Sequence, residues 1–143
     1  MRKEYILKDV EASKLFAKEL ASKARESDVY FLYGELGAGK TFFVTHFCKE
    51  IGVEEFVSSP SYVLLNQYKG SEYPIFHLDL YRLGSEEEVY ELGITDFIDG
   101  GITFVEWPNI AEEILPAERV EIYFEIIEDY RKAVVIDRRK NGT

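Results

Sequence analysis

Residues 34–41 read Gly34-Glu35-Leu36-Gly37-Ala38-Gly39-Lys40-Thr41, which is the GxxxxGK[ST] spacing of a phosphate-binding loop. The apolar run at 29–33 before this loop predicts a buried strand, and residues 42–51 after it predict a helix. Backbone N–H groups that converge at a helix N-terminus, together with the helix dipole, favour a bound polyphosphate. Because both flanks have the structure that such a loop requires, we predict a nucleotide-binding site here.

The residues of this stretch have distinct expected roles. Its glycines allow the backbone to curl tightly, the ammonium of Lys40 would meet the outer phosphates, and the hydroxyl of Thr41 would reach a Mg²⁺ ion that bridges them. An ordinary glycine-rich turn is the alternative, and the match of the full pattern with its flanks argues against it. The predicted nucleotide-binding residues are Gly34, Glu35, Leu36, Gly37, Ala38, Gly39, Lys40, Thr41 and Phe42.

The bulk composition favours one domain, residues 1–143, because a chain that is 46% hydrophobic and 15% aromatic can fill one core of this size. The apolar runs are too short for a transmembrane helix, and residues 1–4 lead into no secretory segment. These features predict a cytoplasmic chain that meets no membrane. The single cysteine, Cys48, is interpreted as a small buried hydrophobe on the predicted helix, which excludes disulfides and cysteine-based metal sites.

The formal charge of −10 argues against direct, tight binding of nucleic acid, since such a surface repels a phosphate backbone. Basic residues gather near the C-terminus, and they are interpreted as a solvated tail, with contact to an acidic partner or an RNA as the alternative. These residues are Arg131, Lys132, Arg138, Arg139 and Lys140.

The remaining patterns predict an α/β fold. In chain order they indicate a strand at 4–7, a helix capped by Asp9, a hydroxyl-rich loop at 58–61, a hairpin of strands 62–68 and 74–80, a short helix capped by Ser85 that stops at Gly93, a strand at 102–105, a helix at 109–115 and a closing hairpin of 120–126 and 133–136. The expected architecture is a mainly parallel central sheet around the strand at 29–33, flanked by helices and extended by antiparallel hairpins.

A phosphate loop also needs a carboxylate opposite Thr41, on a buried strand beside its own strand. Glu106 follows the apolar run at 102–105, whereas Asp79 lies on an alternating stretch that places it on one face with His77. The pattern does not rank them, so both are candidates. The predicted catalytic residues are Lys40, Asp79 and Glu106, and the predicted metal-binding residues are Thr41, Asp79 and Glu106.

One residue close to each candidate carboxylate can be interpreted in two ways. His77 is interpreted as a hydrogen-bonded structural histidine, with a catalytic base as the alternative. Trp107 is interpreted as a core residue, with an aromatic wall of the site as the alternative. The sequence contains neither the guanine-reading NKxD motif nor DxxG, so ATP is the expected nucleotide.

Taken together, the motifs resemble those of the bacterial TsaE (YjeE) family of small P-loop ATPases. In the family's order and spacing, the chain carries GELGAGKT at 34–41, SPSYVLLNQY at 59–68, HLDLYRL at 77–83, ELGITDF at 91–97 and VEWP at 105–108. The resemblance spans most of the chain and omits about the last thirty residues. It implies a role in making threonylcarbamoyladenosine in tRNA, in which ATP and Mg²⁺ act at an interface with TsaD and TsaB, the pair that performs the transfer.

The resemblance also assigns residues. It implies that Thr41 and Glu106 lie at the Mg²⁺ ion and that Asp79 is a further acid needed for activity. It also implies that the adenine lies near residues 10–13, with Arg131 close by. Ser61 stands where the family usually has threonine, so a switch-like contact to the nucleotide is expected from its hydroxyl alone.

An acidic chain fits this pathway if a partner holds the tRNA, so that the RNA is contacted indirectly if at all. A small-molecule phosphotransferase and a nucleotide-gated binding module that needs no hydrolysis remain as alternatives.

Overall fold

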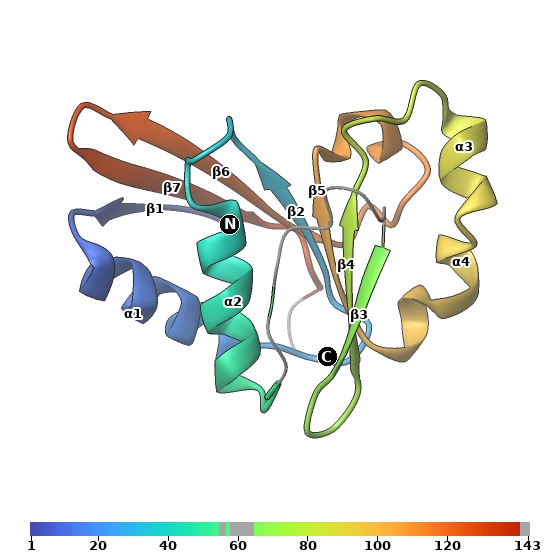
Figure 1. Cartoon of the computed structure of the whole chain (residues 1–143), viewed down its shortest axis with the longest axis horizontal. Helices are drawn as coiled ribbons and strands as arrows, with labels where there is room; N and C mark the ends of the chain where they lie inside the picture. The colour runs from blue at the N-terminus through green and yellow to red at the C-terminus, as the bar shows by residue number, and fades with distance from the viewer. Residues whose placement is uncertain (55–56, 58–64, 141–143) are drawn as a thin grey trace.

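The computed structural model describes residues 1–54, 57 and 65–140 (Figure 1). Helices and strands are interspersed along the chain, and the strands form one sheet. They are β1 (Arg2–Leu7), α1 (Val10–Ala21), β2 (Val29–Tyr33), α2 (Lys40–Glu50), β3 (Leu65–Lys69), β4 (Pro74–Asp79), α3 (Glu86–Glu91), α4 (Ile94–Phe97), the 3-10 helix η1 (Ile98–Gly100), β5 (Ile102–Glu106), the 3-10 helix η2 (Pro108–Ala111), β6 (Val120–Ile127) and β7 (Tyr130–Asp137).

The sheet has seven strands in the order β1-β7-β6-β2-β5-β4-β3. The central strands β6, β2, β5 and β4 are parallel, and β2 lies between β6 and β5. Antiparallel pairing adds β7 and then β1 at one edge and β3 at the other. This arrangement confirms the predicted fold class. The first residues of the predicted strand 62–68 lie outside the described residues.

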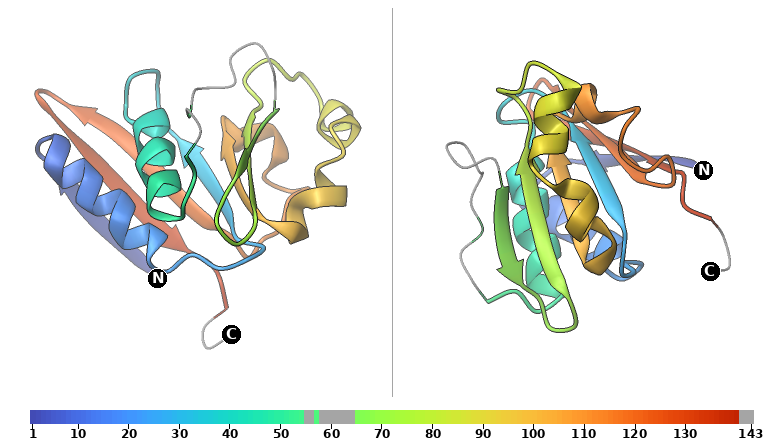
Figure 2. Two further views of the ribbon diagram at one scale, coloured as in Figure 1. Left: turned by 60° about the horizontal axis from the view of Figure 1, so that its bottom comes forward. Right: turned by 90° about the vertical axis from the view of Figure 1, so that its right-hand side faces the viewer.

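Helices lie on both faces of the sheet (Figures 1 and 2). On one face, α1 and α2 pack through Phe16, Phe43 and Phe47 against strand residues such as Phe104. On the other face, α3, α4 and the segment after β5 pack on β2, β4 and β5. Since successive strand residues point to opposite faces, β2, β4 and β5 each contribute to both cores.

The helix starts follow from local capping. The carboxylate of Asp9 accepts a hydrogen bond from the N–H of Ala12 at 2.8 Å, which satisfies one of the free donors at the start of α1. The hydroxyl of Ser85 accepts one from the N–H of Glu88 at 3.3 Å at the start of α3. Both predicted caps are confirmed.

The predicted helix at 109–115 is wrong, because the structure has only the short 3-10 helix η2 there. The N–H groups of Ile114 and Leu115 both donate to the carbonyl of Ala111, at 3.2 and 3.0 Å, which closes a single turn. Pro116 has no N–H with which to continue a helix by bonding the carbonyl of Glu112. Arg119 donates to that carbonyl instead, at 2.8 Å. The short helix α4 was not predicted; it begins directly after Gly93, which ends α3 with a φ of 72°.

The interpretation of the C-terminal basic residues as a solvated tail is also wrong. β7 continues to Asp137, and the guanidinium of Arg139, only 12% exposed, bonds Asp28 at 2.7 Å and Asp137 at 2.8 Å. Lys132 and Arg138 pair with carboxylates of β1 and β6. These cations are therefore partners of acidic residues in the sheet.

Among the residues that the structure describes, no helix combines the length and the hydrophobicity that crossing a bilayer requires. Cys48, a residue of α2, is buried in the core as predicted, and burial raises the pKa of its thiol to about 12. The thiol therefore stays protonated at neutral pH and is a packing residue.

Candidate active site

Loop 34–39 joins the end of β2 to the start of α2. It passes close to β6, because a Cβ at Gly34 would lie 2.8 Å from the carbonyl oxygen of Phe124. Gly39 precedes α2 with a φ of 115°, a conformation that side chains rarely adopt. The loop therefore needs glycine at these positions. It places the N-terminus of α2 at the carboxyl end of the parallel strands.

Lys40 is the first residue of α2, and its side chain is buried at 5% exposure. Its Nζ lies 3.9 Å from the centre of the Trp107 ring and 4.0 Å from Oε1 of Glu106. Burial lowers the pKa of Lys40, and the carboxylates of Glu106 and Asp79 oppose that shift. The ammonium is thus a desolvated charge at the start of a helix, which attracts an anion more strongly than an exposed lysine does.

The two candidate carboxylates lie at neighbouring strand ends. Asp79 ends β4, Glu106 ends β5, and the two residues are register partners. Glu106 also pairs with Leu32 of β2, the strand that leads into the loop, so Glu106 lies one strand nearer to the loop than Asp79. Parallel strands bring their carboxyl ends to one edge of the sheet, which is why residues 27 positions apart meet here.

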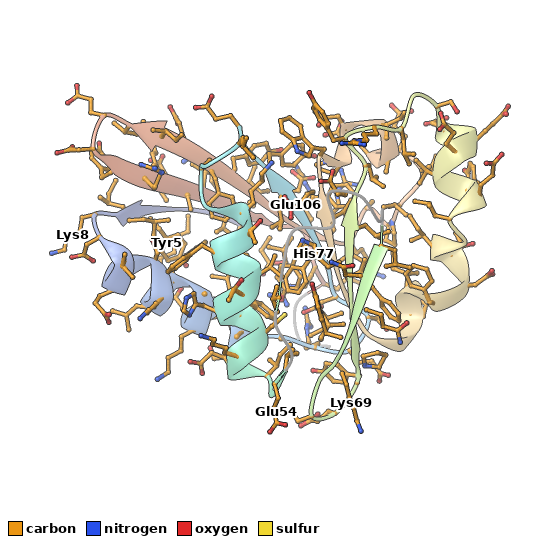
Figure 3. All side chains as sticks on the ribbon, viewed as in Figure 1. Tyr5, Lys8, Glu54, Lys69, His77 and Glu106 are labelled. Carbon is orange, nitrogen blue, oxygen red and sulfur yellow. The ribbon has the colours of Figure 1, made fainter. Side chains whose placement is uncertain are left out.

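Burial raises the pKa of the Asp79 carboxyl above its ordinary value, and the charge of Glu106 adds to the effect. The N–H of Tyr81 donates to Asp79 Oδ1 at 2.9 Å and opposes the shift. Glu106 is only 3% exposed. Its Oε2 lies 2.6 Å from Nε2 of His77, which is fully buried (Figure 3). The prediction that His77 is hydrogen-bonded is therefore confirmed.

The interpretation of Trp107 as a core residue is wrong. Trp107 is half-buried with a positive φ of 53°, and its ring contacts Tyr81 at 4.9 Å between centroids as well as Lys40. This backbone conformation turns the side chain at the end of β5 over the loop. The alternative interpretation, an aromatic wall of the site, describes its position.

A cleft of about 600 Å³ contains these groups. Its lining brings together the three predicted catalytic residues, Thr41 and three aromatic residues. The lining residues are Leu36, Gly37, Gly39, Lys40, Thr41, Phe42, Asp79, Tyr81, Glu106 and Trp107. Among the remaining predicted site residues, Glu35 and Ala38 form the turn of the loop through a hydrogen bond from Ala38 N–H to the Glu35 carbonyl at 3.1 Å.

A second hollow, of about 320 Å³, adjoins the other side of the loop. It brings Val10 and Ser13 of α1 together with Arg131 of β7, and Nε of Arg131 donates to the carbonyl of Gly37 at 3.3 Å. The two segments associated with adenine by resemblance thus lie side by side, next to the loop. Ser61 lies outside the described residues.

The sequence did not single out Phe124, Asp129 and Tyr130, which also line this hollow. Their place beside the loop depends on the pairing of β6 with β2, which leaves no local signal in the chain. The contact of Tyr81 with Trp107 is likewise a result of the fold.

The site fits a magnesium-bound nucleotide better than a metal ion alone. In the described part of the chain, no group of three or more histidine, cysteine, aspartate or glutamate side chains could hold a metal by itself. Mg²⁺ is often bound by one or two protein oxygens together with phosphate and water. Thr41, Asp79 and Glu106 in one cleft match that donor set.

The chain is similar to a family of known proteins. Residues 7–134 match the family model described as "Threonylcarbamoyl adenosine biosynthesis protein TsaE". The chain is 39% identical to the tRNA threonylcarbamoyladenosine biosynthesis protein TsaE of Rickettsia felis over 89% of this chain and 75% of that protein. It is 39% identical to the TsaE protein of Bacillus subtilis over 78% and 70% of the two chains.

A solved structure has the same fold. The crystal structure of Bacillus subtilis YdiB superposes with a TM-score of 0.80 at 29% identity, covering 96% of this chain and 86% of that one. A family match over most of the chain, close relatives and a shared fold agree with one another. The chain therefore belongs to the TsaE family of threonylcarbamoyladenosine biosynthesis proteins.

Proposed function

We propose that this chain is a Mg²⁺-dependent ATPase of tRNA threonylcarbamoyladenosine synthesis that acts with TsaD and TsaB in the cytoplasm and does not itself transfer the carbamoyl group. One observation carries the proposal: the buried ammonium of Lys40, at the start of α2, shares a cleft with Asp79 and Glu106 from adjacent strand ends. A cation at a helix N-terminus opposite paired carboxylates suits a polyphosphate and its metal ion.

In this proposal, the N–H groups of residues 37–41 and the ammonium of Lys40 bind the phosphates. The Thr41 hydroxyl, with Glu106 or Asp79, would hold Mg²⁺, which when bound neutralises charge on the phosphoryl oxygens. The carboxylate that is not occupied in this way can accept a hydrogen bond from the attacking water and so orient it. Both carboxylates are candidates for that second role, because both line the cleft.

The second hollow suits the adenosine. It opens on the same loop, and it combines apolar walls from Val10 and Phe124 with the guanidinium of Arg131. A base needs apolar or aromatic surface to stack on, together with a few polar groups that fix its orientation. The absence of NKxD and DxxG from the sequence favours adenine over guanine.

The partners are inferred from family membership together with charge. A chain with a net charge of −10 is a poor surface for tRNA, so TsaD and TsaB are expected to hold the RNA. Hydrolysis is expected to be weak in isolation and faster in the complex, because a partner can complete an open cleft and exclude water from it.

The test measures nucleotide affinity by calorimetry and steady-state ATP turnover with and without TsaD–TsaB. We expect ATP to bind in the presence of Mg²⁺, Lys40→Ala to lose that binding, and turnover to rise with the partners. Absence of binding heat would contradict the proposal. If Glu106→Gln and Asp79→Asn bind ATP, do not hydrolyse it, and still support tRNA modification, the chain is a nucleotide-gated binding module instead.

A further inference from the structure

His77 is a buried polar residue with one hydrogen-bond partner. Its side chain is fully buried on β4, its Nε2 lies 2.6 Å from Oε2 of Glu106, and no group of the described residues hydrogen-bonds its Nδ1. Its ring neighbours are Tyr68 and Phe104. An apolar residue would fill such a place at lower cost in free energy, because a buried nitrogen without a partner is destabilising. The contact with Glu106 is therefore the feature that requires a histidine.

The two oxygens of Glu106 face different groups. Oε2 is held by His77, whereas Oε1 faces the ammonium of Lys40 at 4.0 Å, the outer limit of an ion pair. Lys40 and Glu106 are both almost fully buried, so their attraction is only weakly screened. Without a restraint on the carboxylate, we expect the two charges to move into direct contact.

We propose that His77 is a positioning residue that keeps the Glu106 carboxylate apart from Lys40. In this arrangement Nε2–H donates to Oε2, which fixes the side-chain rotamer of Glu106 and leaves Oε1 and the Lys40 ammonium both facing the cleft. A proton on Nε2 leaves Nδ1 as an unprotonated acceptor, the less costly form for a nitrogen without a partner. In many metal sites a carboxylate orients a histidine ligand through a hydrogen bond to the ring. Here the roles are reversed, because the histidine orients the carboxylate. The inference rests on the proposed ATPase function.

Three variants separate positioning from packing. His77→Leu keeps the bulk and removes the donor, His77→Gln retains an amide N–H near the position of Nε2, and His77→Asn carries the same amide on a shorter side chain. We expect kcat for ATP to fall about 10- to 100-fold in His77→Leu and His77→Asn, as for other residues that orient a functional group. We expect His77→Gln to recover most of the rate.

Thr103→Val is the matched control. Thr103 is also fully buried, its Oγ1 also has no hydrogen-bond partner among the described residues, and it lies on β5 but on the face opposite to Glu106. We expect wild-type kcat from this variant. If His77→Leu loses thermal stability but retains the wild-type kcat, or if His77→Gln does no better than His77→Asn, the positioning role is wrong.

Two further measurements do not depend on turnover. Nitrogen-15 NMR of His77 in the wild-type chain should show the proton on Nε2, and a crystal structure of His77→Leu should show the Glu106 carboxylate moved toward Lys40. An Nε2 without a proton, or an unmoved carboxylate, overturns the inference even if the chain is an ATPase. If the wild-type chain does not hydrolyse ATP while both results are as expected, the proposed function fails and the positioning of Glu106 stands.

Discussion

The ammonium of Lys40 lies over the ring of Trp107, with Nζ 3.9 Å from the ring centroid. The first residue of α2 and the residue after β5 thus form one wall of the cleft, although 67 positions separate them in the chain. An indole face attracts a cation, and the contact keeps the ammonium inside the cleft, near the start of α2.

This contact makes tryptophan fluorescence a direct report of binding, because Trp107 is the single tryptophan of the chain. A polyphosphate that draws Lys40 away from the ring changes the surroundings of the indole. We expect the emission to change on addition of MgATP and to saturate at the affinity that calorimetry gives. Lys40→Ala should abolish the change. Binding heat without any change in emission would show that the nucleotide lies away from Trp107.

The order of the two carboxylates gives a second prediction. Glu106 lies on the strand next to β2 and faces Lys40, so we expect Glu106→Gln to lower kcat for ATP by about 10²- to 10⁴-fold, the range for loss of an acid–base group. Asp79→Asn, one strand farther out, should lower kcat less. Both variants should still bind ATP. The exposed Glu125→Gln on β6 is the control, and a larger effect from Asp79→Asn would reverse the ranking.

Arg131 tests the adenosine hollow. Its Nε donates to the carbonyl of Gly37 and its side chain lines the hollow beside Val10. We expect Arg131→Met to weaken ATP binding by about tenfold or more, since a hydrogen bond from a charged group contributes about 1.5–3 kcal/mol. Binding of inorganic tripolyphosphate should change less.

Lys132→Met is the neighbouring control for that experiment, because Lys132 pairs with Glu4 of β1 instead of lining the hollow. Equal losses for ATP and tripolyphosphate in Arg131→Met would place Arg131 at the phosphates and leave the hollow without a role in adenosine binding.

Gly34→Ala tests the close approach between the loop and β6. The added Cβ would meet the Phe124 carbonyl oxygen at 2.8 Å, at a φ of 144° that L side chains rarely adopt. We expect the free energy of unfolding to fall by about 1–3 kcal/mol, the usual cost of forcing an atom into filled space. Urea denaturation measures it. Gly100→Ala is the control, since nothing lies within 4 Å of its Cβ position, and equal losses in both variants would refute the argument.

Arg139 tests the attachment of the C-terminal segment. Arg139→Met removes the nearest cation from the carboxylate of Asp28, which is buried and keeps only Arg25 at 4.0 Å. We expect a loss of about 3–5 kcal/mol in the free energy of unfolding, the cost of breaking one side of a buried ion pair. The adjacent cation, Lys140, is 71% exposed and pairs with Glu118. Lys140→Met should lower the free energy of unfolding by only about 0–1 kcal/mol. Similar melting curves for both variants would show that the Asp28 pair contributes little.

The parts of this protein that could be predicted from sequence are those decided by neighbouring residues. Spacing alone indicated the loop at 34–41 between a strand and a helix, because glycines and a following helix are local requirements. Asp9 and Ser85 predicted their helix starts because a cap bonds an N–H only three residues away. The alternating and apolar runs predicted the strands, and the motifs predicted the family.

Other features were decided by the tertiary structure, because they depend on which strands become neighbours. The bond between His77 and Glu106, the register of Asp79 with Glu106, and the ring of Trp107 over Lys40 all join segments that meet only when β4, β5 and β2 align. The spacing of residues along a chain does not say which strands become neighbours or in which register they pair. The register is fixed only when the buried faces of the strands are matched in the folded sheet. The sequence by itself therefore determined the loop, its flanks and the family, whereas the fold decided how the carboxylates, the histidine and the lysine face one another.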